Sequence, residues 1–320
     1  MKPKIIFSTP IYSTNQYPQW HYCLELIQSI KHAMPAESYL HIIVNDGSTD
    51  KTSEVLTKMA KKDNNIVLVN IDKTDGTHAF NLGIDISIDP NKHRHLLSTE
   101  DLKKIKKLQA QYISFIGVDD LYGGDYYNQL LEANRYPQDH VLFYGNYKSF
   151  LKHNHYSRVE FSPYRTNLKE LYQQLLLVEN FPSHTIMFRK KFVKELKKYR
   201  NLELGILNPN FLSPIAYDMM LEATKLSIAK KYQFGFLLGN MGYKRYGIEG
   251  TMTEKNKKAG RYPKERKFVY EANKDYMKKN NIPFASQRPK LDSLYFKRLE
   301  DEKETIKDLC LKKILQEVNN

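Results

Sequence analysis

The stretch Leu40-His-Ile-Ile-Val-Asn-Asp-Gly-Ser-Thr-Asp50 begins as an apolar run and ends in a cluster of small and acidic residues. A second stretch, Tyr112-Ile-Ser-Phe-Ile-Gly-Val-Asp-Asp120, is built in the same way. Both apolar runs are rich in β-branched and aromatic residues and are too short for helices, so they predict buried strands. Ligands collect outside the carboxyl ends of strands in open α/β sheets. The carboxylates that end these runs therefore predict a ligand site at one edge of a sheet.

Short apolar runs alternate with helical patterns over the first half of the chain, which predicts parallel strands joined by crossover helices. The predicted strands are 4–8, 40–45, 66–71 and 111–118, and the predicted helices are 20–33 and 52–61. The second half departs from this alternation, with strands predicted at 141–147 and 184–188 and helices at 168–178 and 190–199. After Thr253 the pattern is helical and basic.

The composition, with 41% hydrophobic residues in a chain of 320, excludes a largely disordered protein. No apolar stretch reaches the roughly 18 to 20 residues that span a bilayer, and the first residues resemble a strand more than a secretory signal. Cys23 and Cys310 predict neither a disulfide framework nor a zinc site. We therefore expect a cytoplasmic protein, with the inner face of a membrane as a candidate site of peripheral attachment.

The net charge of +14 is unevenly distributed. Residues 244–279 contain twelve Lys/Arg against five Asp/Glu, which is half of the whole excess in a short segment. Such a segment is either a solvated helix face or a surface for an anionic partner, and anionic lipid, an acidic glycan acceptor and nucleic acid all fit that description.

A long connection, 86–111, contains two basic clusters, Pro90-Asn-Lys-His-Arg-His95 and Lys103-Lys-Ile-Lys-Lys107. Loops of this length are often functional or mobile. Ser98-Thr-Glu-Asp101, followed by apolar spacing, favours a capped helix within it. Two interpretations of its histidines stay open at this point, as metal ligands or as ordinary surface residues.

Five landmarks follow one another in order: Pro10-Ile-Tyr12, Asn45-Asp-Gly-Ser-Thr-Asp50, Gly76 to Gly83 around Asn81, Gly117-Val-Asp-Asp120 and Ala216-Tyr-Asp218. Together they resemble glycosyltransferase family 2, the inverting enzymes of the GT-A fold, over about residues 2–253. The resemblance implies an α/β, Rossmann-like GT-A domain with a mostly parallel mixed sheet at 1–253. Its donor half would be about 1–125 and its acceptor half about 126–253, followed by a basic helical extension at 254–320. Residues 86–111 would be an addition to the usual family pattern.

The resemblance also implies a site for the nucleoside of a sugar donor. Asp46 would accept a hydrogen bond from uracil, Pro10 and Tyr12 would line the same pocket, and Asn81 would lie nearby. Taken alone, residues 45–50 are equally typical of an Asx turn that caps a helix, and capping accounts fully for Asp50.

A divalent cation, Mn²⁺ or Mg²⁺, would bridge the two phosphates of the donor. Asp120 would be its direct ligand, and Asp119 would contact ribose, the metal or a metal-bound water, because hard cations take carboxylate oxygens. Lys244 and Arg245 would share in neutralising the diphosphate. The commoner family form has a carboxylate in place of Gly117. The alternative is a solvated Asp-Asp turn without a ligand.

Asp218 is the candidate general base, which would take the proton of the attacking hydroxyl. The competing interpretation is an Asp in a first helical turn, stabilised by the helix dipole, and Glu222 is a spare carboxylate one turn further on. His184 would bind acceptor or phosphate, or would be a structural histidine.

These assignments predict an inverting, hexosyltransferase-type enzyme. It would move a sugar from a nucleoside-diphosphate sugar, with a UDP-sugar preferred, to a hydroxyl of a surface glycan or glycolipid. One alternative is transfer to modified nucleic acid. Another is a non-catalytic module that binds an anionic surface.

Overall fold

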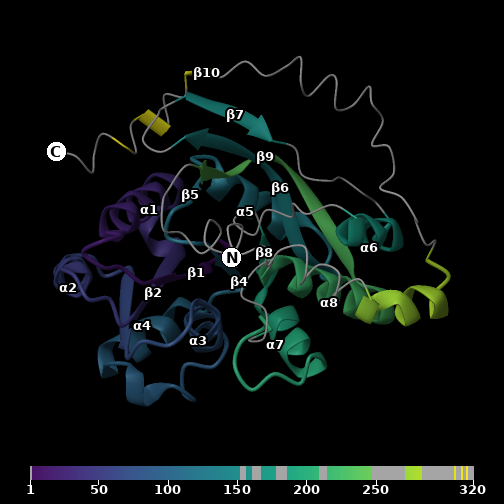
Figure 1. Ribbon diagram of the computed structural model, residues 1–320, viewed down its shortest axis with the longest axis horizontal. Coiled ribbons are helices and arrows are strands. Elements are labelled where there is room, and N and C mark those ends of the chain that lie inside the picture. Colours follow the sequence, from purple (N-terminus) through teal and green to yellow (C-terminus); the bar gives the residue numbers. More distant parts are fainter. Residues whose placement is uncertain are drawn as a thin grey trace.

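Ten strands form a single mixed sheet in the computed structural model (Figure 1). The structure describes residues 2–151, 156–160, 167–177, 186–208, 215–246, 271–282, 306–307, 311–312 and 315. The strand order is β10-β7-β6-β8-β4-β1-β2-β3, and β9 pairs with both β6 and the short β5. This arrangement is the α/β fold with a mostly parallel mixed sheet that the sequence predicts.

The parallel half of the sheet consists of β1 (Ile5–Ile11), β2 (Tyr39–Asp46), β3 (Ile66–Ile71) and β4 (Tyr112–Phe115). β1 lies between β2 and β4 and is parallel to both, and β2 is parallel to β3. Their carboxyl ends therefore meet at one edge. β4 stops at Phe115, before the predicted limit of Val118, because the chain turns there into β5 (Leu121–Tyr122).

Helices cover both faces of the sheet. On one face, α1 (Trp20–Ala33), α2 (Thr52–Lys62) and α5 (Tyr126–Arg135) pack on the strands, and Phe7 of β1 contributes to this core. On the other face lie α3 (Gly76–Ile88), α4 (Thr99–Leu108), α6 (Leu168–Leu177), α7 (Lys190–Tyr199) and α8 (Ile215–Lys230). Ile6 points to this second core. The alternation along β1 follows from the two-residue repeat of a strand.

The second half of the sheet is mixed and contains β6 (His140–Leu151), β7 (Tyr156–Glu160), β8 (Met187–Arg189) and β9 (Gln233–Tyr246). β8 is antiparallel to β4 and to β6, and β9 is parallel to β6. β9 therefore runs in the same direction as β4 and ends at the same edge as the parallel strands. Because α8 leads through a short turn into the start of β9, the first turn of α8 also lies toward that edge.

The connection between α3 and β4 contains η2 (Arg94–Leu96) and the predicted helix, α4. Ser98 caps α4, since its Oγ accepts the Asp101 N–H at 3.0 Å. His95 is exposed, as a surface histidine would be, but His93 is buried and pairs with Asp85 Oδ2 at 2.8 Å. Within the described ranges, no three His, Cys, Asp or Glu side chains converge as a metal site.

The described parts of the predicted C-terminal extension pack on the rest of the protein. Residues 271–279 are helical, and Met277 and Ile282 join the core formed with α6 and α8. The Tyr172 hydroxyl donates to Asn273 Oδ1 at 2.5 Å. Further on, β10 (Ile306–Lys307) is a strand antiparallel to β7, where the sequence predicts a helix. None of the helices in the described segments has the length and apolarity needed to cross a bilayer.

His41 makes the stability of the fold sensitive to acid. Its ring is buried in β2, with Nε2 3.0 Å from Thr9 Oγ1. Burial lowers the pKa of His41 to about 3, against an opposing effect of Asp63. Between about pH 3 and pH 6.5 the folded protein therefore binds fewer protons than the unfolded chain. This contribution to stability is complete above pH 6.5 and is lost as the pH falls through that window.

We predict that His41→Leu weakens this acid sensitivity. Between pH 6.5 and pH 5 the wild type should lose about 2 kcal/mol more of its unfolding free energy than the variant does. Urea unfolding at the two pH values measures the difference. The exposed His95→Gln is the control and should follow the wild type, whereas an unchanged pH dependence in His41→Leu would contradict the prediction.

Candidate active site

The loops that follow β1 and β2 are bound to each other through Ser13. Its N–H donates to Ser48 Oγ at 3.0 Å and its Oγ donates to Asp50 Oδ2 at 2.6 Å. Asp50 Oδ1 also accepts the Thr52 N–H at 3.0 Å, at the start of α2. Asp50 thus binds both the loop after β1 and the start of α2, although the N-cap of α2 is Lys51 and not Asp50. These hydrogen bonds join the two loops.

Asp46 ends β2 with a carboxylate that is only 1% exposed. Oδ1 accepts both the N–H and the hydroxyl of Thr74 at 2.7 Å, and Oδ2 accepts from Lys73 Nζ at 2.5 Å. The same ammonium lies 4.3 Å from the centre of the Tyr12 ring, which is 40% exposed. Pro10 pairs with Val44 one strand away. Tyr12, Asp46 and Lys73 therefore form a small site with an aromatic face, a hydrogen-bond acceptor and a donor.

A glycine allows this close approach. Gly47 has φ +67°, a left-handed conformation, and a Cβ there would lie 2.6 Å from the backbone nitrogen of Lys73. Any other residue would push the loop after β3 away from Asp46.

Asp119 and Asp120 lie in the turn between β4 and β5, beside the end of β9. β5 pairs antiparallel with β9, with Leu121 opposite Tyr243. Asp120 Oδ1 accepts the Arg245 N–H at 2.9 Å, and the Asp119 carbonyl accepts from Arg245 Nε at 3.0 Å. The turn is therefore fixed from both ends, by the sheet and by Arg245.

Both carboxyl groups resist ionisation. Burial and the neighbouring charge of Asp119 raise the pKa of Asp120 to about 7, and burial raises the pKa of Asp119, although Lys244 and Arg245 oppose both shifts. Burial is the larger cause in both groups, because it disfavours the charged form of a carboxyl group. This is the condition that a bound cation relieves.

The donor atoms fit a hard divalent cation. Asp119 and Asp120 supply carboxylate oxygens, which Mg²⁺ and Mn²⁺ prefer, and one or two carboxylates suffice where phosphates and water complete the shell. Gly117 takes part in this arrangement, because a Cβ there would lie 2.9 Å from Asp119 Oδ1. The absence of a side chain at 117 thus leaves the space that the Asp119 carboxylate uses.

The two cations predicted to meet the diphosphate differ in exposure. Lys244 is half-buried at the end of β9 and close enough to lower the pKa of both carboxyl groups. Arg245 is only 4% exposed, and its guanidinium is ion-paired with Glu25 of α1. In this structure Arg245 holds the turn, and the contacts of both cations with the diphosphate stay predictions.

Asp218 lies in the first turn of α8, where it is buried and ion-paired with Arg200 Nη2. Burial raises the pKa of its carboxyl, Arg200 opposes the shift and Glu222 adds to it. Arg200 Nη1 also donates to the Ile206 carbonyl at 2.9 Å. Asp218 is thus held at the edge of the sheet that carries the other carboxylates. Glu222 pairs instead with Lys225 at 2.7 Å.

Asn81 holds the segment between α7 and α8. Its Oδ1 accepts the N–H groups of Ile206 and Leu207 at 3.0 and 2.8 Å, and its Nδ2 donates to the Leu207 carbonyl at 2.8 Å. Gly205 has φ +57°, and a Cβ there would lie 2.2 Å from Asn81 Oδ1. In this structure Asn81 is a buried clamp, and its predicted contact with the nucleoside stays a prediction. His184 lies outside the described residues.

Three residues of the site escape sequence reasoning: Glu25, Lys73 and Arg200. Only Lys73 has a signal in the sequence, because it follows a predicted strand by two residues, at the same sheet edge as Asp46. Glu25 lies on α1 and Arg200 directly follows α7, and the polar residues of both helices look like ordinary solvated positions.

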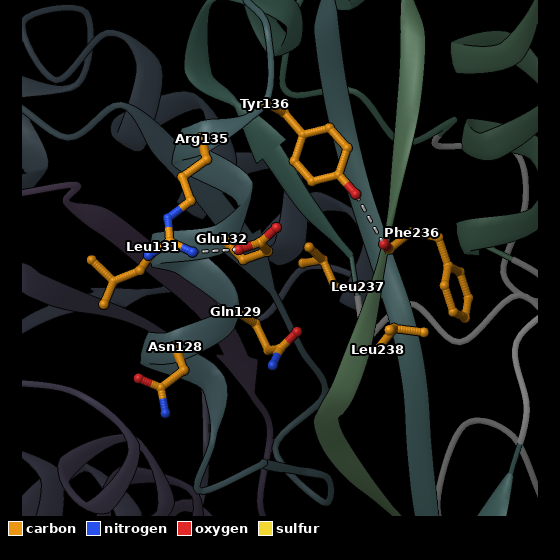
Figure 2. A pocket seen from close by; sticks show the side chains of 9 residues that line it. All are labelled: Asn128, Gln129, Leu131, Glu132, Arg135, Tyr136, Phe236, Leu237 and Leu238. Carbon is orange, nitrogen blue, oxygen red and sulfur yellow. Dashed lines mark hydrogen bonds and ion pairs between the residues drawn. The ribbon is translucent and has the colours of Figure 1, made fainter.

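A separate pocket of about 450 Å³ lies between α5 and β9 (Figure 2). Leu238 of β9 is 86% exposed beside it, and the Tyr136 hydroxyl donates to the Phe236 carbonyl at 3.3 Å. The pocket is lined by Asn128, Gln129, Leu131, Glu132, Arg135, Tyr136, Phe236, Leu237 and Leu238. None of the predicted site residues that the structure describes lines it, so it is distinct from the carboxylate edge.

The sequence model of the family described as Glycosyl transferase family 2 matches residues 10–197, which is more than half of the chain. The chain belongs to glycosyl transferase family 2. The matched segment contains Asp46, Asp119 and Asp120, whereas Asp218 and Arg245 lie beyond it. Family membership and the strand order together confirm the predicted GT-A fold class.

Individual relatives are distant. Glycosyltransferase GlyG of Streptococcus pneumoniae serotype 4 is 28% identical over 133 residues, which cover 40% of this chain and 40% of GlyG. The crystal structure of S. aureus TarS 1-349 with UDP-GlcNAc is 13% identical, with a TM-score of 0.49, and covers 78% of this chain and 60% of that one. The mannosyltransferase PcManGT from Pyrobaculum calidifontis, with GDP-Man and Mn²⁺, is 14% identical, with a TM-score of 0.46 and coverage of 78% and 59%. The chain thus spans about two fifths of GlyG.

We predict that Asp120→Asn stabilises the protein in the absence of ligands and abolishes its response to Mn²⁺. The raised pKa of Asp120 means that its contribution to stability is present below about pH 4 and is lost as the pH rises through about 7. At pH 8 the neutral amide should therefore raise the unfolding free energy by on the order of 2 kcal/mol. Thermal unfolding with EDTA and with Mn²⁺ measures both effects.

Asp125→Asn is the matched control, since this half-buried carboxylate lies in the same part of the chain but binds Asn128 and Gln129. It should retain the Mn²⁺ response of the wild type. A variant Asp120→Asn that is less stable than the wild type at pH 8, or that still responds to Mn²⁺, would contradict the assignment.

Proposed function

We propose that this protein is an inverting glycosyltransferase that moves a hexosyl group from a nucleoside-diphosphate sugar, preferably a UDP-sugar, to a hydroxyl acceptor. The observation that carries the proposal is the convergence of two unlike sites on one sheet edge. Asp46, Lys73 and Tyr12 suit a nucleobase, and Asp119 with Asp120 suits a cation on the diphosphate. Family membership supports the same reaction class.

The base site favours uracil by its hydrogen-bonding pattern. Asp46 offers an acceptor for N3–H, Lys73 offers a donor for O4, and the Tyr12 ring offers a face for stacking. Cytosine presents the opposite pattern at these positions, with an acceptor at N3 facing the acceptor of Asp46 and a donor at N4 facing the donor of Lys73. Guanine repeats the uracil pattern on a larger ring, so GDP-sugars belong in any donor screen.

Asp119 and Asp120 would hold the cation, with Lys244 adding positive charge beside it. When bound, Mn²⁺ or Mg²⁺ supplies Lewis-acid stabilisation of the negative charge on the departing diphosphate. Burial raises the pKa values of both carboxyl groups, and a bound cation would favour their charged forms.

Asp218 would act as the general base on the acceptor hydroxyl. Inversion requires one carboxylate opposite the leaving group, and the burial that raises the pKa of Asp218 brings it closer to the value an efficient base needs. Arg200 opposes this shift through its charge and fixes the orientation of the carboxyl group. The acceptor class that we propose is a surface glycan or glycolipid, and a cytoplasmic or inner-membrane location is part of the same proposal.

We predict that Asp218→Asn lowers turnover by about 10²- to 10⁴-fold, the range that general bases contribute. The measurement is release of nucleoside diphosphate from a panel of UDP- and GDP-sugars, with and without Mn²⁺ and with candidate acceptors. Glu222→Gln, one helical turn away, is the control and should stay near the wild type. Normal turnover by a folded Asp218→Asn protein would remove the base assignment.

The same panel separates the rival functions. Transfer to nucleic acid should weaken steeply as salt rises, whereas transfer to a neutral glycan should not. A non-catalytic binding module would release no nucleoside diphosphate from any donor, with or without Mn²⁺.

We predict that Lys73→Met weakens UDP binding and removes the preference for UDP over CDP. Loss of a charged hydrogen bond should cost about tenfold to a hundredfold in affinity. Calorimetric titration with UDP and with CDP measures both quantities. Lys58→Met removes an exposed lysine of α2, ion-paired with Glu54, and should leave both affinities unchanged. Equal UDP and CDP affinities in the wild type would refute the assignment of Tyr12, Asp46 and Lys73 as a nucleobase site.

A further inference from the structure

Glu25 and Arg245 form a buried ion pair directly behind the Asp119–Asp120 turn. Glu25, on α1, is 2% exposed and pairs with Arg245 Nη2. The guanidinium also lies between two aromatic rings, 4.6 Å from the centre of Tyr22 and 4.7 Å from that of Phe150. The Arg245 side chain thus has a partner on α1, one ring from α1 and one from β6, which leave it little freedom to move.

Such a pair is costly to bury. Removing two charges from water carries a penalty that their attraction often fails to recover, so a buried ion pair is weak evidence for stability. The geometry suggests another use. Arg245 presents Nε to the Asp119 carbonyl and its backbone N–H to Asp120 Oδ1, while Glu25 takes the end of the guanidinium.

The pairing has an electrostatic consequence. An unpaired arginine beside two carboxylates would serve as their counter-ion and would compete with an added cation. Glu25 supplies a negative charge to Arg245 on its far side. Arg245 can then hold the turn by directed hydrogen bonds while Glu25 balances its charge.

We propose that Glu25 is a positioning residue for the cation site, which acts through Arg245 to orient the Asp119–Asp120 turn and to keep its charge available. This inference rests on the proposed function, because it assigns Glu25 a role toward the cation. The inference adds α1 to the elements that build the cation site, and neither of the predicted cation ligands lies on that helix. Outer-shell partners of this kind typically change metal affinity by roughly 10- to 100-fold when they are removed.

The test is calorimetric titration of the full-length protein at pH 8 with Mn²⁺ in the presence of UDP, and with UDP in the presence of EDTA. For Glu25→Gln we expect Mn²⁺ binding to weaken by about 10- to 100-fold, with UDP binding in EDTA within about twofold of the wild type. UDP affinity in EDTA reports on the nucleobase site formed by Tyr12, Asp46 and Lys73. A change confined to the Asp119–Asp120 turn should leave this affinity unaltered.

A matched control and a second variant protect the test against misfolding. Asp85→Asn breaks another ion pair of a fully buried carboxylate, with Lys197, that contacts neither Asp119 nor Asp120, and it should leave Mn²⁺ affinity unchanged. The double variant Glu25→Gln/Arg245→Gln removes both buried charges together, so that neither is left unpaired. It should also bind Mn²⁺ at least about tenfold more weakly, because the Nε hydrogen bond to Asp119 is lost.

Wild-type Mn²⁺ affinity in both folded variants would overturn the inference and leave the proposed function intact. Equal losses of Mn²⁺ and UDP binding would also overturn it, since that result describes general damage to the fold. A wild-type protein that binds UDP but no Mn²⁺ would overturn the proposed cation site and this inference together.

Discussion

The parallel pairing of β1 with both β2 and β4 is the constraint on which the rest of this protein depends. It sets the carboxyl ends of neighbouring strands side by side, so that residues remote in sequence reach one edge. The turn after each strand then supplies one part of the site. Tyr12 follows β1, Asp46 ends β2, Lys73 follows β3, and Asp119 with Asp120 follow β4. β9 is parallel to β6 and runs in the same direction as these strands, so that its end lies beside the turn between β4 and β5.

The charges at this edge are balanced unequally. Asp46 has Lys73, Asp218 has Arg200, and Glu25 has Arg245, each as a direct ion pair. Burial raises the pKa values of Asp119 and Asp120, although Lys244 and Arg245 oppose both shifts. Three carboxylates at this edge are thus fixed by ion pairs, and the two carboxyl groups of the turn are the ones whose charged forms a cation would favour.

Much of this organisation can be predicted from the sequence, because strand and helix periodicity are local properties. The β3 strand and the α7 helix have their predicted limits, and the strand-end rule locates Asp46, Asp119 and Asp120 at one edge. The direction in which a side chain points depends on partners that can be remote in the sequence. Arg245 looks like a cation for phosphate, but its partner Glu25 lies 220 residues earlier. Likewise, no short-range pattern indicates that Asn81 binds the backbone of Leu207.

The junction at Asp85 bears on how this scaffold can be rebuilt. This fully buried carboxylate of α3 meets His93 and Lys92 from the long connection and Lys197 from α7. The long connection therefore cannot be deleted without effect, because its removal would leave the buried Asp85 carboxylate with only Lys197 of its three basic neighbours. A loop graft between relatives would have to include α7, because Lys197 of that helix pairs with Asp85. The two halves of the protein are therefore coupled at Asp85 and are not interchangeable modules.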